Sequence, residues 1–318
     1  MNILETIELQ VDQGIPHIAD KEFSLAVGFF DGLHKGHQTV IQRAVDTSKK
    51  LGLVPAVMTF NPHPSHLFSN ENGKIGYITP LEEKQRILKS MGIDTLFIVT
   101  FDQNLANLTP EEFVVQVLKE LNVRHVTAGF DFTFGAKGKG NMEQMTSLSN
   151  GVFGTTSVEK VAEGGEKISS TRIRKLLAEG NVAKTASLLG RPFRSIGTVV
   201  DGDKRGRQLG FPTANIIPSD EVIVPQNGVY AVRFTVDGNR YDGVCNIGVK
   251  PTFDHPDEAR KTIEVNVFDF DEDLYGKQVF VDWIDHIRTE QKFDSIDNLV
   301  NQIAQDKETA KNILSKKD

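Results

Sequence analysis

The segment from Gly28 to His37 carries residue types that suit phosphate chemistry. It reads G-F-F-D-G-L-H-K-G-H and joins an apolar run to a helix-like stretch. Glycines let a backbone approach a ligand closely, and the start of a helix attracts anions. His34 and His37 share a face if the helix begins between them. Protonated or hydrogen-bond-donating imidazoles there stabilise charge that develops on a phosphate leaving group. The alternative is a glycine-rich turn with two exposed histidines.

A zinc site is the competing interpretation of the histidines. His34 with His37 and His63 with His66 form two H-x-x-H pairs, and four imidazoles can bind zinc. Neither pair has the spacing of a known zinc motif, and the N-P-H-P segment around His63 is too stiff to turn readily onto a shared ion. Phosphate binding is therefore the favoured interpretation.

Two later segments have the composition of ligand-contacting loops. Residues 129–135 read G-F-D-F-T-F-G, and aromatic rings on such a loop can stack on a flat ligand, although alternating Phe is more often core. Residues 168–174 read I-S-S-T-R-I-R, where hydroxyl caps and arginine make a second anion site. The alternative for this segment is an ordinary capped helix with solvated arginines. Neither a Walker A loop nor a Rossmann G-x-G-x-x-G motif is present.

A further phosphate-binding candidate lies at residues 202–215, which read G-D-K-R-G-R-Q-L-G-F-P-T-A-N. Such a loop can wrap a polyphosphate with backbone N–H groups. Thr213 and Asn215 alternate, so both side chains can point one way and offer neutral oxygens to Mg²⁺. The alternative is a basic surface loop that binds nucleic acid.

Glu264 lies in a segment that alternates cleanly between apolar and polar residues. Ile263, Val265 and Val267 form the expected buried face of a strand and leave Glu264 on the opposite face. A strand Glu of this kind is usually only solvated. One that faces a phosphate loop can instead take the proton from an attacking hydroxyl.

The elements of the first half alternate between strand and helix patterns. Apolar runs at residues 24–30, 53–60, 93–101 and 124–129 are typical of strands covered on both faces of a parallel sheet. Thr79-Pro80 and Thr109-Pro110, each with a Glu two residues later, predict helices with threonine as the cap and proline as the first helical residue. This alternation predicts a doubly wound α/β domain over residues 1–187.

The pattern changes near residue 190, and strand runs follow one another without intervening helices. They lie at residues 196–200, 229–236, 241–247, 262–270 and 278–284, with a hairpin turn predicted at Asp237-Gly238-Asn239. Apolar residues from Ile296 to Leu314 recur at helical spacing. The pattern predicts a small antiparallel β-barrel or sandwich with a C-terminal helix over residues 188–318.

Composition narrows the class of protein. The 318 residues suit two domains, and a net charge of −7, with neither half basic, argues against a nucleic-acid coat or a membrane-surface binder. The single Cys245 excludes an intramolecular disulfide and a multi-cysteine zinc site. The N-terminus lacks a secretion pattern, and no apolar run approaches the ~20 residues of a membrane span. We expect a cytoplasmic protein.

The motifs together resemble a known family along nearly the whole chain. In the first half, G-x-F-D-G-x-H-x-G-H, N-P-H-P, G-x-D-F-x-F-G and I-S-S-T-R-I-R resemble, in this order, the adenylyltransferase domain of bacterial bifunctional riboflavin kinase/FAD synthetases. In the second half, G-R-x-L-G-F-P-T-A-N, E-V-x-V-x-D-F and R-x-E-x-K-F resemble riboflavin kinase. The resemblance implies a Rossmann-like FMN adenylyltransferase domain at 1–187 and a riboflavin kinase barrel at 188–318. The implied reactions are phosphorylation of riboflavin to FMN and adenylylation of FMN to FAD.

The resemblance also implies a role for each matching position. In the first domain, the residues that it implies to be catalytic are His34, His37 and Arg172. The residues implied to bind the nucleotide are Gly28, Phe30, Asp31, Gly36, Asn61, Asp131, Ser169, Ser170 and Thr171. Phe134 is implied to contact the flavin. In the second domain, it implies that Glu264 is the catalytic base and that Thr213 and Asn215 bind Mg²⁺-ATP. Gly202 and Gly210 are implied to bind the nucleotide, and Arg288, Glu290 and Phe293 are implied to lie beside the flavin. Asn246 and Thr252 are interpreted as structural.

The implied ligands are riboflavin, FMN, FAD, ATP, ADP and pyrophosphate, with Mg²⁺ as cofactor and without nucleic acid, a membrane or an obligate protein partner. One rival is a nucleotidyltransferase for another substrate with the barrel as a specificity module, and Thr213, Asn215 and Glu264 argue against it. The other is a flavin or RNA binder without activity. RNA binding is disfavoured because the barrel half is acidic.

Overall fold

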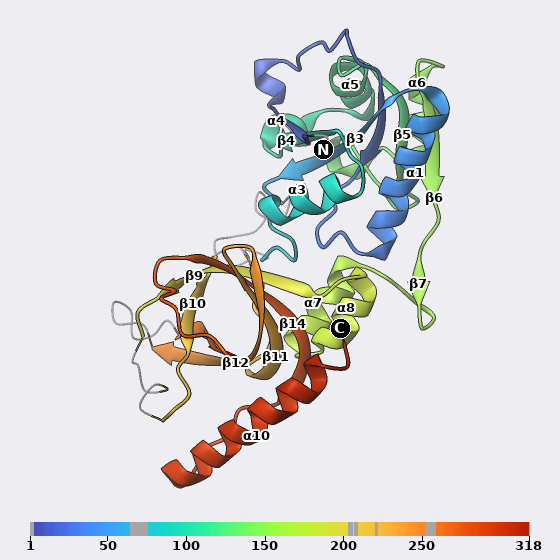
Figure 1. The fold of residues 1–318 in the computed structure, drawn as a ribbon. Helices are drawn as coiled ribbons and strands as arrows, with labels where there is room; N and C mark the ends of the chain where they lie inside the picture. The colour runs from blue at the N-terminus through green and yellow to red at the C-terminus, as the bar shows by residue number, and fades with distance from the viewer. Residues whose placement is uncertain are drawn as a thin grey trace. The chain divides into compact units, whose positions relative to one another are not determined.

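The structure, a computed structural model, describes residues 3–63, 76–202, 206, 209–219, 222–251 and 259–317 (Figure 1). By their contacts, the described residues form two compact units. The first comprises residues before 64 and residues 79–169, and the second comprises residues 76–78 and 170–317. Residues 170–187, which the sequence analysis places in the first domain, therefore pack with the second unit.

The first unit is built on a six-stranded sheet. Its strands are β1 (Glu5–Leu9), β2 (Phe23–Val27), β3 (Val54–Asn61), β4 (Thr95–Thr100), β5 (Val123–Gly129) and β6 (Gly154–Val158). They run parallel in the order β1-β4-β3-β2-β5-β6. Its helices are η1 (Val11–Gln13), α1 (Lys35–Leu51), α3 (Leu81–Ser90), α4 (Gln103–Asn107), α5 (Pro110–Phe113), η3 (Val114–Lys119), η4 (Ala136–Gly138) and α6 (Met142–Ser149), and strands β7 (Ala162–Glu163) and β8 (Glu166–Lys167) form a separate hairpin.

Helices cover both faces of this sheet, as the continuous apolar runs predict. On one face, α1 and α3 pack on residues such as Ala26 and Val57. On the other, α4, α5, η3 and α6 pack on residues such as Leu25 and Met58. The doubly wound α/β prediction is confirmed. The outer strands β1 and β6 were not predicted from the sequence. Much of their surface is polar because they lie at the sheet edges.

One of the two predicted threonine caps is confirmed and the other is wrong. Thr109 caps α5, whose first residue is Pro110, and a full capping box forms with Glu112. At α3 the helix begins at Leu81, one residue later than predicted, and Pro80 occupies the cap position. The Thr79 backbone N–H donates to Asp31 Oδ1 at 3.0 Å, and no side chain caps this helix.

The second unit is a closed six-stranded antiparallel barrel with helices. The strands are β9 (Phe193–Val200), β10 (Ala214–Pro218), β11 (Gly228–Val236), β12 (Asn239–Pro251), β13 (Ala259–Val267) and β14 (Gln278–Arg288), in the order β10-β13-β12-β11-β14-β9. Helices α7 (Ser170–Ala178) and α8 (Val182–Leu189) precede them, and α10 (Ile296–Leu314) follows. Tyr230, Trp283 and Ile263 lie in the barrel interior, while Val229, Val244 and Ile284 pack on the outside with Leu314 of α10.

The barrel, the terminal helix and the β11–β12 hairpin were all predicted. Asp237 and Gly238 both have positive φ, at 50° and 80°, as a two-residue hairpin turn requires. Strand β10 was not predicted as a strand, since its first two residues, Ala214 and Asn215, were interpreted as the end of a loop. No described helix is both long and apolar enough to cross a membrane.

A short segment from the middle of the first half belongs to the second unit. Tyr77 forms a parallel bridge with Val222, and the Tyr77 carbonyl accepts a hydrogen bond of 3.1 Å from Ile223 N. Tyr77 and Val222 are both buried. The second unit is therefore made of two pieces of chain.

Candidate active sites

Three of the predicted ligand segments leave neighbouring strands at one edge of the parallel sheet. The Gly28–His37 segment follows β2, Asn61 ends β3, and the 129–135 segment follows β5. Because β2 pairs with β3 on one side and β5 on the other, the three carboxyl ends are adjacent. Here the strand order switches direction, which is where doubly wound sheets bind ligands.

The loop before α1 has an unusual backbone. Phe30 and Leu33 have φ of 51° and 41°, and both side chains are buried. His34 caps α1, and its Nδ1 accepts a hydrogen bond of 3.2 Å from the backbone N–H of His37. An Nδ1 that accepts carries no proton, so the proton of a neutral His34 ring lies on Nε2. The helix begins at Lys35, between the two histidines.

The two imidazole rings stack, with centroids 3.6 Å apart. Burial is the main reason that the pKa of His37 lies well below its ordinary value, and the neighbouring His34, Lys84 and Lys167 lower it further. His37 is therefore neutral near pH 7, and its buried Nδ1 has no hydrogen-bond partner among the described residues. The alternative of two exposed histidines is wrong, since His34 is buried. The pair suits donation of neutral N–H groups rather than fixed cationic charge.

The absence of a side chain at Gly36 lets the His34 ring and the 168–171 segment lie close to the start of α1. A Cβ at Gly36 would lie 3.1 Å from His34 Cε1 and 3.9 Å from the Ile168 carbonyl oxygen. Ile168 immediately precedes Ser169, so this segment reaches the start of α1. A side chain at position 36 would press on the His34 ring.

Lys84 is a buried cation beneath this loop that the sequence analysis missed. Its ammonium donates to the Phe29 carbonyl at 3.1 Å and to the Thr59 hydroxyl at 3.0 Å. Its side chain is 4% exposed, and burial lowers its pKa to about 8 against the opposing effect of Asp31. The signal was its place on the apolar face of α3 with Ile87 and Leu88, because lysine is almost never buried there without partners.

The other predicted residues of the first unit have mixed surroundings. Gly28 lies against the Phe30 ring, and Asp31 is buried and holds Thr79. Asp131 is exposed and forms an ion pair with Lys167. Phe134 is buried in the core, 5.5 Å between ring centroids from Phe113.

Ser170, Thr171 and Arg172 open α7 and belong to the second unit. Zinc finds no support in the described part of the chain, which contains no group of three or more His, Cys, Asp and Glu side chains able to hold a metal ion. His66 lies outside the described residues, as do Lys204, Arg205, Arg207 and Thr252.

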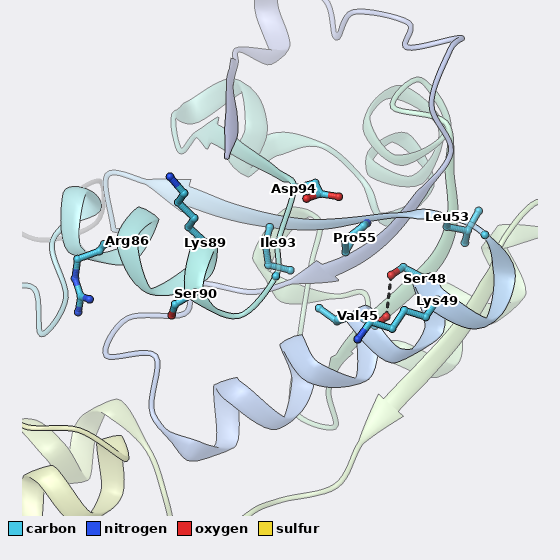
Figure 2. A pocket seen from close by; sticks show the side chains of 12 residues that line it. Val45, Ser48, Lys49, Leu53, Pro55, Arg86, Lys89, Ser90, Ile93 and Asp94 are labelled. Carbon is cyan, nitrogen blue, oxygen red and sulfur yellow. Dashed lines mark hydrogen bonds between the residues drawn. The ribbon is translucent and has the colours of Figure 1, made fainter. Parts of the chain in front are cut away.

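A cavity of about 680 Å³ lies at the other edge of the sheet (Figure 2). It is lined by Pro55 at the start of β3 and Asp94 just before β4, so it faces the amino ends of the strands. Lys49 and Lys89 line it from the last turns of α1 and α3, where they complement the negative ends of the helix dipoles. These lysines have a structural explanation, and we assign the candidate site to the carboxyl edge.

In the second unit, a row of polar residues crosses three strands of the barrel. Asn215 on β10 lies directly opposite Glu264 on β13, and Asn246 on β12 lies opposite Glu264 from the other side. The flanking Ile263 and Val265 are fully buried, so the row is on the outer face. Asn246, interpreted from the sequence as structural, is thus a neighbour of the candidate base.

Two glycines approach the predicted magnesium ligands. A Cβ on Gly202 would lie 2.2 Å from Asn215 Nδ2, and one on Gly206 would lie 3.3 Å from Thr213 Oγ1. Ala214 between Thr213 and Asn215 is buried, so Asn215, its neighbour on β10, faces away from the core. Gly210, with φ of 83°, lies in the turn just before them.

Asn266 supports this loop and was missed from the sequence. Its Nδ2 donates to the Pro212 carbonyl at 2.6 Å, one residue before Thr213. Its place two residues after Glu264 on the same strand face was the available signal. The structure therefore brings Thr213, Asn215 and Glu264 together and shows what holds the loop.

The predicted flavin contacts lie beside this row and near α10. Glu290 accepts a hydrogen bond of 3.1 Å from Asn227 Nδ2, and a Cβ on Gly248 would lie 3.1 Å from Glu290 Oε1 and 3.5 Å from Asn246 Nδ2. Arg288 is occupied by a 2.7 Å ion pair with the buried Asp306 of α10, and its guanidinium carbon lies 5.8 Å from the centre of the Phe293 ring.

Comparison with known proteins agrees with this two-part arrangement. The family described as FAD synthetase matches residues 17–172, and the family described as riboflavin kinase matches residues 189–314. The bifunctional riboflavin kinase/FMN adenylyltransferase of Bacillus subtilis (strain 168) is 46% identical over 286 residues, 90% of each chain. The protein of the same name from Listeria monocytogenes is 40% identical over 292 residues, 92% of each chain. The chain belongs to the bifunctional riboflavin kinase/FMN adenylyltransferase family.

The chain thus carries an FAD synthetase domain followed by a riboflavin kinase domain. Among solved structures, one described as a macrolide-efflux protein from Streptococcus pneumoniae superposes with a TM-score of 0.89 at 36% identity, covering 97% of this chain and 99% of that one. Its description differs from those of the sequence relatives, and the family membership rests on the relatives and on the two matching domains.

Proposed function

We propose that this bifunctional enzyme uses the two residue sets described above for two ATP-dependent steps. In the barrel, the 5′-hydroxyl of riboflavin attacks the γ-phosphorus of ATP, which gives FMN and ADP. In the α/β domain, the phosphate of FMN attacks the α-phosphorus of a second ATP, which gives FAD and pyrophosphate. Neither step needs a covalent enzyme intermediate, so positioning and charge stabilisation supply most of the rate.

The kinase proposal is carried by the cross-strand pairing of Asn215 with Glu264. In this position the Glu264 carboxylate takes the proton of the ribityl 5′-hydroxyl as the oxygen attacks. Thr213 and Asn215 hold Mg²⁺ with the ATP phosphates. Their neutral oxygens suit this hard cation, and the backbone of Gly202 and Gly206 approaches where a side chain would intrude. When bound, the ion neutralises charge on the transferred phosphoryl group.

In the α/β domain the phosphates of ATP are bound by His34, His37 and the start of α1, with Gly36 giving the backbone room. Neutral imidazole N–H groups and the helix terminus stabilise the charge that develops on pyrophosphate. The support is the stacked pair with its unpartnered buried His37 Nδ1. Arg172, with Ser169, Ser170 and Thr171, clamps the leaving pyrophosphate in this proposal. Gly28, Phe30, Asp31, Asn61 and Asp131 complete the nucleotide site.

For the flavin we propose Phe134 at the adenylyltransferase site and Arg288, Glu290 and Phe293 at the kinase site. Glu290 is supported by its position beside Gly248 on β12, two residues after Asn246, which lies opposite Glu264. Gly202 and Gly210 shape the kinase phosphate loop. We also propose that neither step requires nucleic acid, a membrane or a protein partner, and that both occur in the cytoplasm. The cytoplasmic setting is supported by the single, buried and free Cys245.

Chromatography of flavins after incubation of the pure chain with riboflavin, ATP and Mg²⁺, with a parallel reaction started from FMN, tests both steps. We expect FMN and then FAD in the first reaction and FAD in the second. Formation of FMN alone would support the proposed kinase site and contradict the proposed role of His34 and His37. FAD formed only from supplied FMN would contradict the kinase site. No product from folded protein would favour a flavin-binding protein without activity.

A further inference from the structure

The loop before α1, which positions His34 and His37, accepts a hydrogen bond from a residue of a different element. Lys84 projects from α3 and donates to the Phe29 carbonyl in the loop and to the Thr59 hydroxyl on β3. Phe29 immediately precedes Phe30, which has positive φ and packs edge-on against His37 with ring centroids 5.4 Å apart. A displacement of Phe29 would therefore reach the His37 ring through one residue.

The backbone on either side of this contact is in an uncommon conformation. Positive φ at Phe30 and Leu33 is disfavoured for large side chains, and it persists only where surrounding contacts impose it. The Lys84 contact is one such constraint. The Asp31 carboxylate, which accepts from Thr79 N, is another, and it connects the same loop to the residues before α3.

The charge of Lys84 also acts on the site. Its positive charge is one of the causes that keep the pKa of His37 low, after burial and His34. The groups that face the ammonium are Asp31 from the loop after β2, His37 from α1 and the Thr59 hydroxyl from β3, while Glu83 and Arg86 on its own helix pair with each other. A buried ammonium with these partners fixes geometry and supplies positive charge below the proposed phosphate site.

We infer that Lys84 is a positioning residue for adenylyl transfer, because it holds the 28–34 loop so that His34 and His37 present their N–H groups to the ATP phosphates. The inference rests on the proposed role of the two histidines. Lys84 does not touch the reacting atoms. It acts through the Phe29 carbonyl, the Thr59 hydroxyl and the field at His37.

The test compares Lys84→Met, Lys84→Arg and the control Lys89→Met in the full chain. Lys89 lies on the same helix but is exposed. We expect Lys84→Met to lower kcat for FMN adenylylation by on the order of 10²-fold, the effect of a misplacement of about 1 Å. Riboflavin phosphorylation by the barrel remains unchanged, which shows that the barrel unit is intact. The control keeps both activities.

Two readouts separate positioning from a merely structural role. Because the pKa of Lys84 is about 8, wild-type adenylylation declines as the pH rises through that value and the ammonium loses its charge. Lys84→Arg retains its charge and lacks this decline. In Lys84→Met, the pKa of His37, followed by NMR of labelled histidine, moves upward because a nearby positive charge is gone.

Wild-type adenylylation by Lys84→Met would overturn the inference, whether or not the pKa of His37 changes. If Lys84→Met unfolds the first unit, Thr59→Val is the second variant: without changing charge, it removes one partner of Lys84 and also the 2.9 Å hydrogen bond from the Thr59 hydroxyl to the Phe29 carbonyl. It is expected to lower kcat and leave the His37 pKa unchanged, with rescue by Thr59→Ser, and wild-type kcat in Thr59→Val would overturn the inference. A His34→Ala/His37→Ala variant that still adenylylates FMN would instead contradict the proposed function. An inactive double variant beside an active Lys84→Met would contradict only the inference.

Discussion

Asn215 and Glu264 lie directly opposite each other on antiparallel strands β10 and β13, on the outer face of the barrel. Side chains paired in this way have Cβ atoms about 5 Å apart, close enough for one bound magnesium–phosphate group to contact one and for the attacking hydroxyl to reach the other. The barrel thus joins a proposed metal ligand and a proposed base through strand register alone.

Replacement of Glu264 by Gln should remove the base and leave the fold intact, since the side chain lies on the outer face. We expect FMN formation to fall by ~10²–10⁴-fold. FAD synthesis from supplied FMN should be unchanged. Flavin chromatography with each starting compound measures both, and Glu272→Gln in an exposed loop is the matched control. Loss of both activities in a folded variant would count against separate sites.

The double variant His34→Ala/His37→Ala should stop the reaction at FMN. Loss of two N–H donors from the phosphate site removes stabilisation of the departing pyrophosphate, and we expect at least about a 10²-fold lower adenylylation rate. Riboflavin phosphorylation serves as the internal control. Normal conversion of FMN to FAD by this variant would show that the phosphates bind elsewhere.

Gly202→Ala should impair the kinase through Asn215. The new Cβ would lie 2.2 Å from the Asn215 amide nitrogen, so the carboxamide must move away from the proposed Mg²⁺-ATP site. We expect a higher KM for Mg²⁺-ATP, of the same size as in Asn215→Ala. The double variant should be no worse than either single one, because both changes remove one interaction. Additive losses would place the effect of Gly202 elsewhere.

Asp306→Asn should weaken the attachment of α10 to the barrel. Asp306 is buried and pairs with Arg288, and disruption of such a pair leaves a poorly compensated charge that costs ~3 kcal/mol of unfolding free energy. Denaturant unfolding measures this. Glu308→Gln on the same helix, whose pair with Lys311 is exposed, should cost under ~1 kcal/mol. Equal effects of the two variants would refute the structural role of Asp306.

Local patterns were sufficient for much of the fold. The apolar runs identified strands β2 to β5 because these are covered on both faces, and the rule that parallel strands bind ligands at their carboxyl ends brought His34, Asn61 and Asp131 to one edge. Strands β1 and β6 were not predicted because they lie at the polar edges of the sheet and lack a continuous apolar run. The predicted cap at Thr79 was wrong because the helix begins one residue later, with Pro80 at the cap position, and Thr79 contacts Asp31, which is far away in the sequence.

Long-range pairing was the part that local patterns could not supply. The sequence around residues 213–215 and 264 does not determine that Asn215 pairs with Glu264 rather than with a residue two positions away on the same strand. The burial of Lys84 likewise depends on Phe29 and Thr59, which come from two other elements. Such residues become visible only when the elements are assembled.

The segment at residues 76–78 limits how this gene could be divided. Tyr77 is supplied from within the first half of the chain, yet it is buried against Val222 in the barrel unit. A fragment that begins at residue 170 or 188 would lack this piece and expose the surface around Val222 to water. Separation of the two halves at either position would therefore remove a buried contact of the barrel unit, and the isolated kinase half is expected to be less stable than the same unit in the full chain.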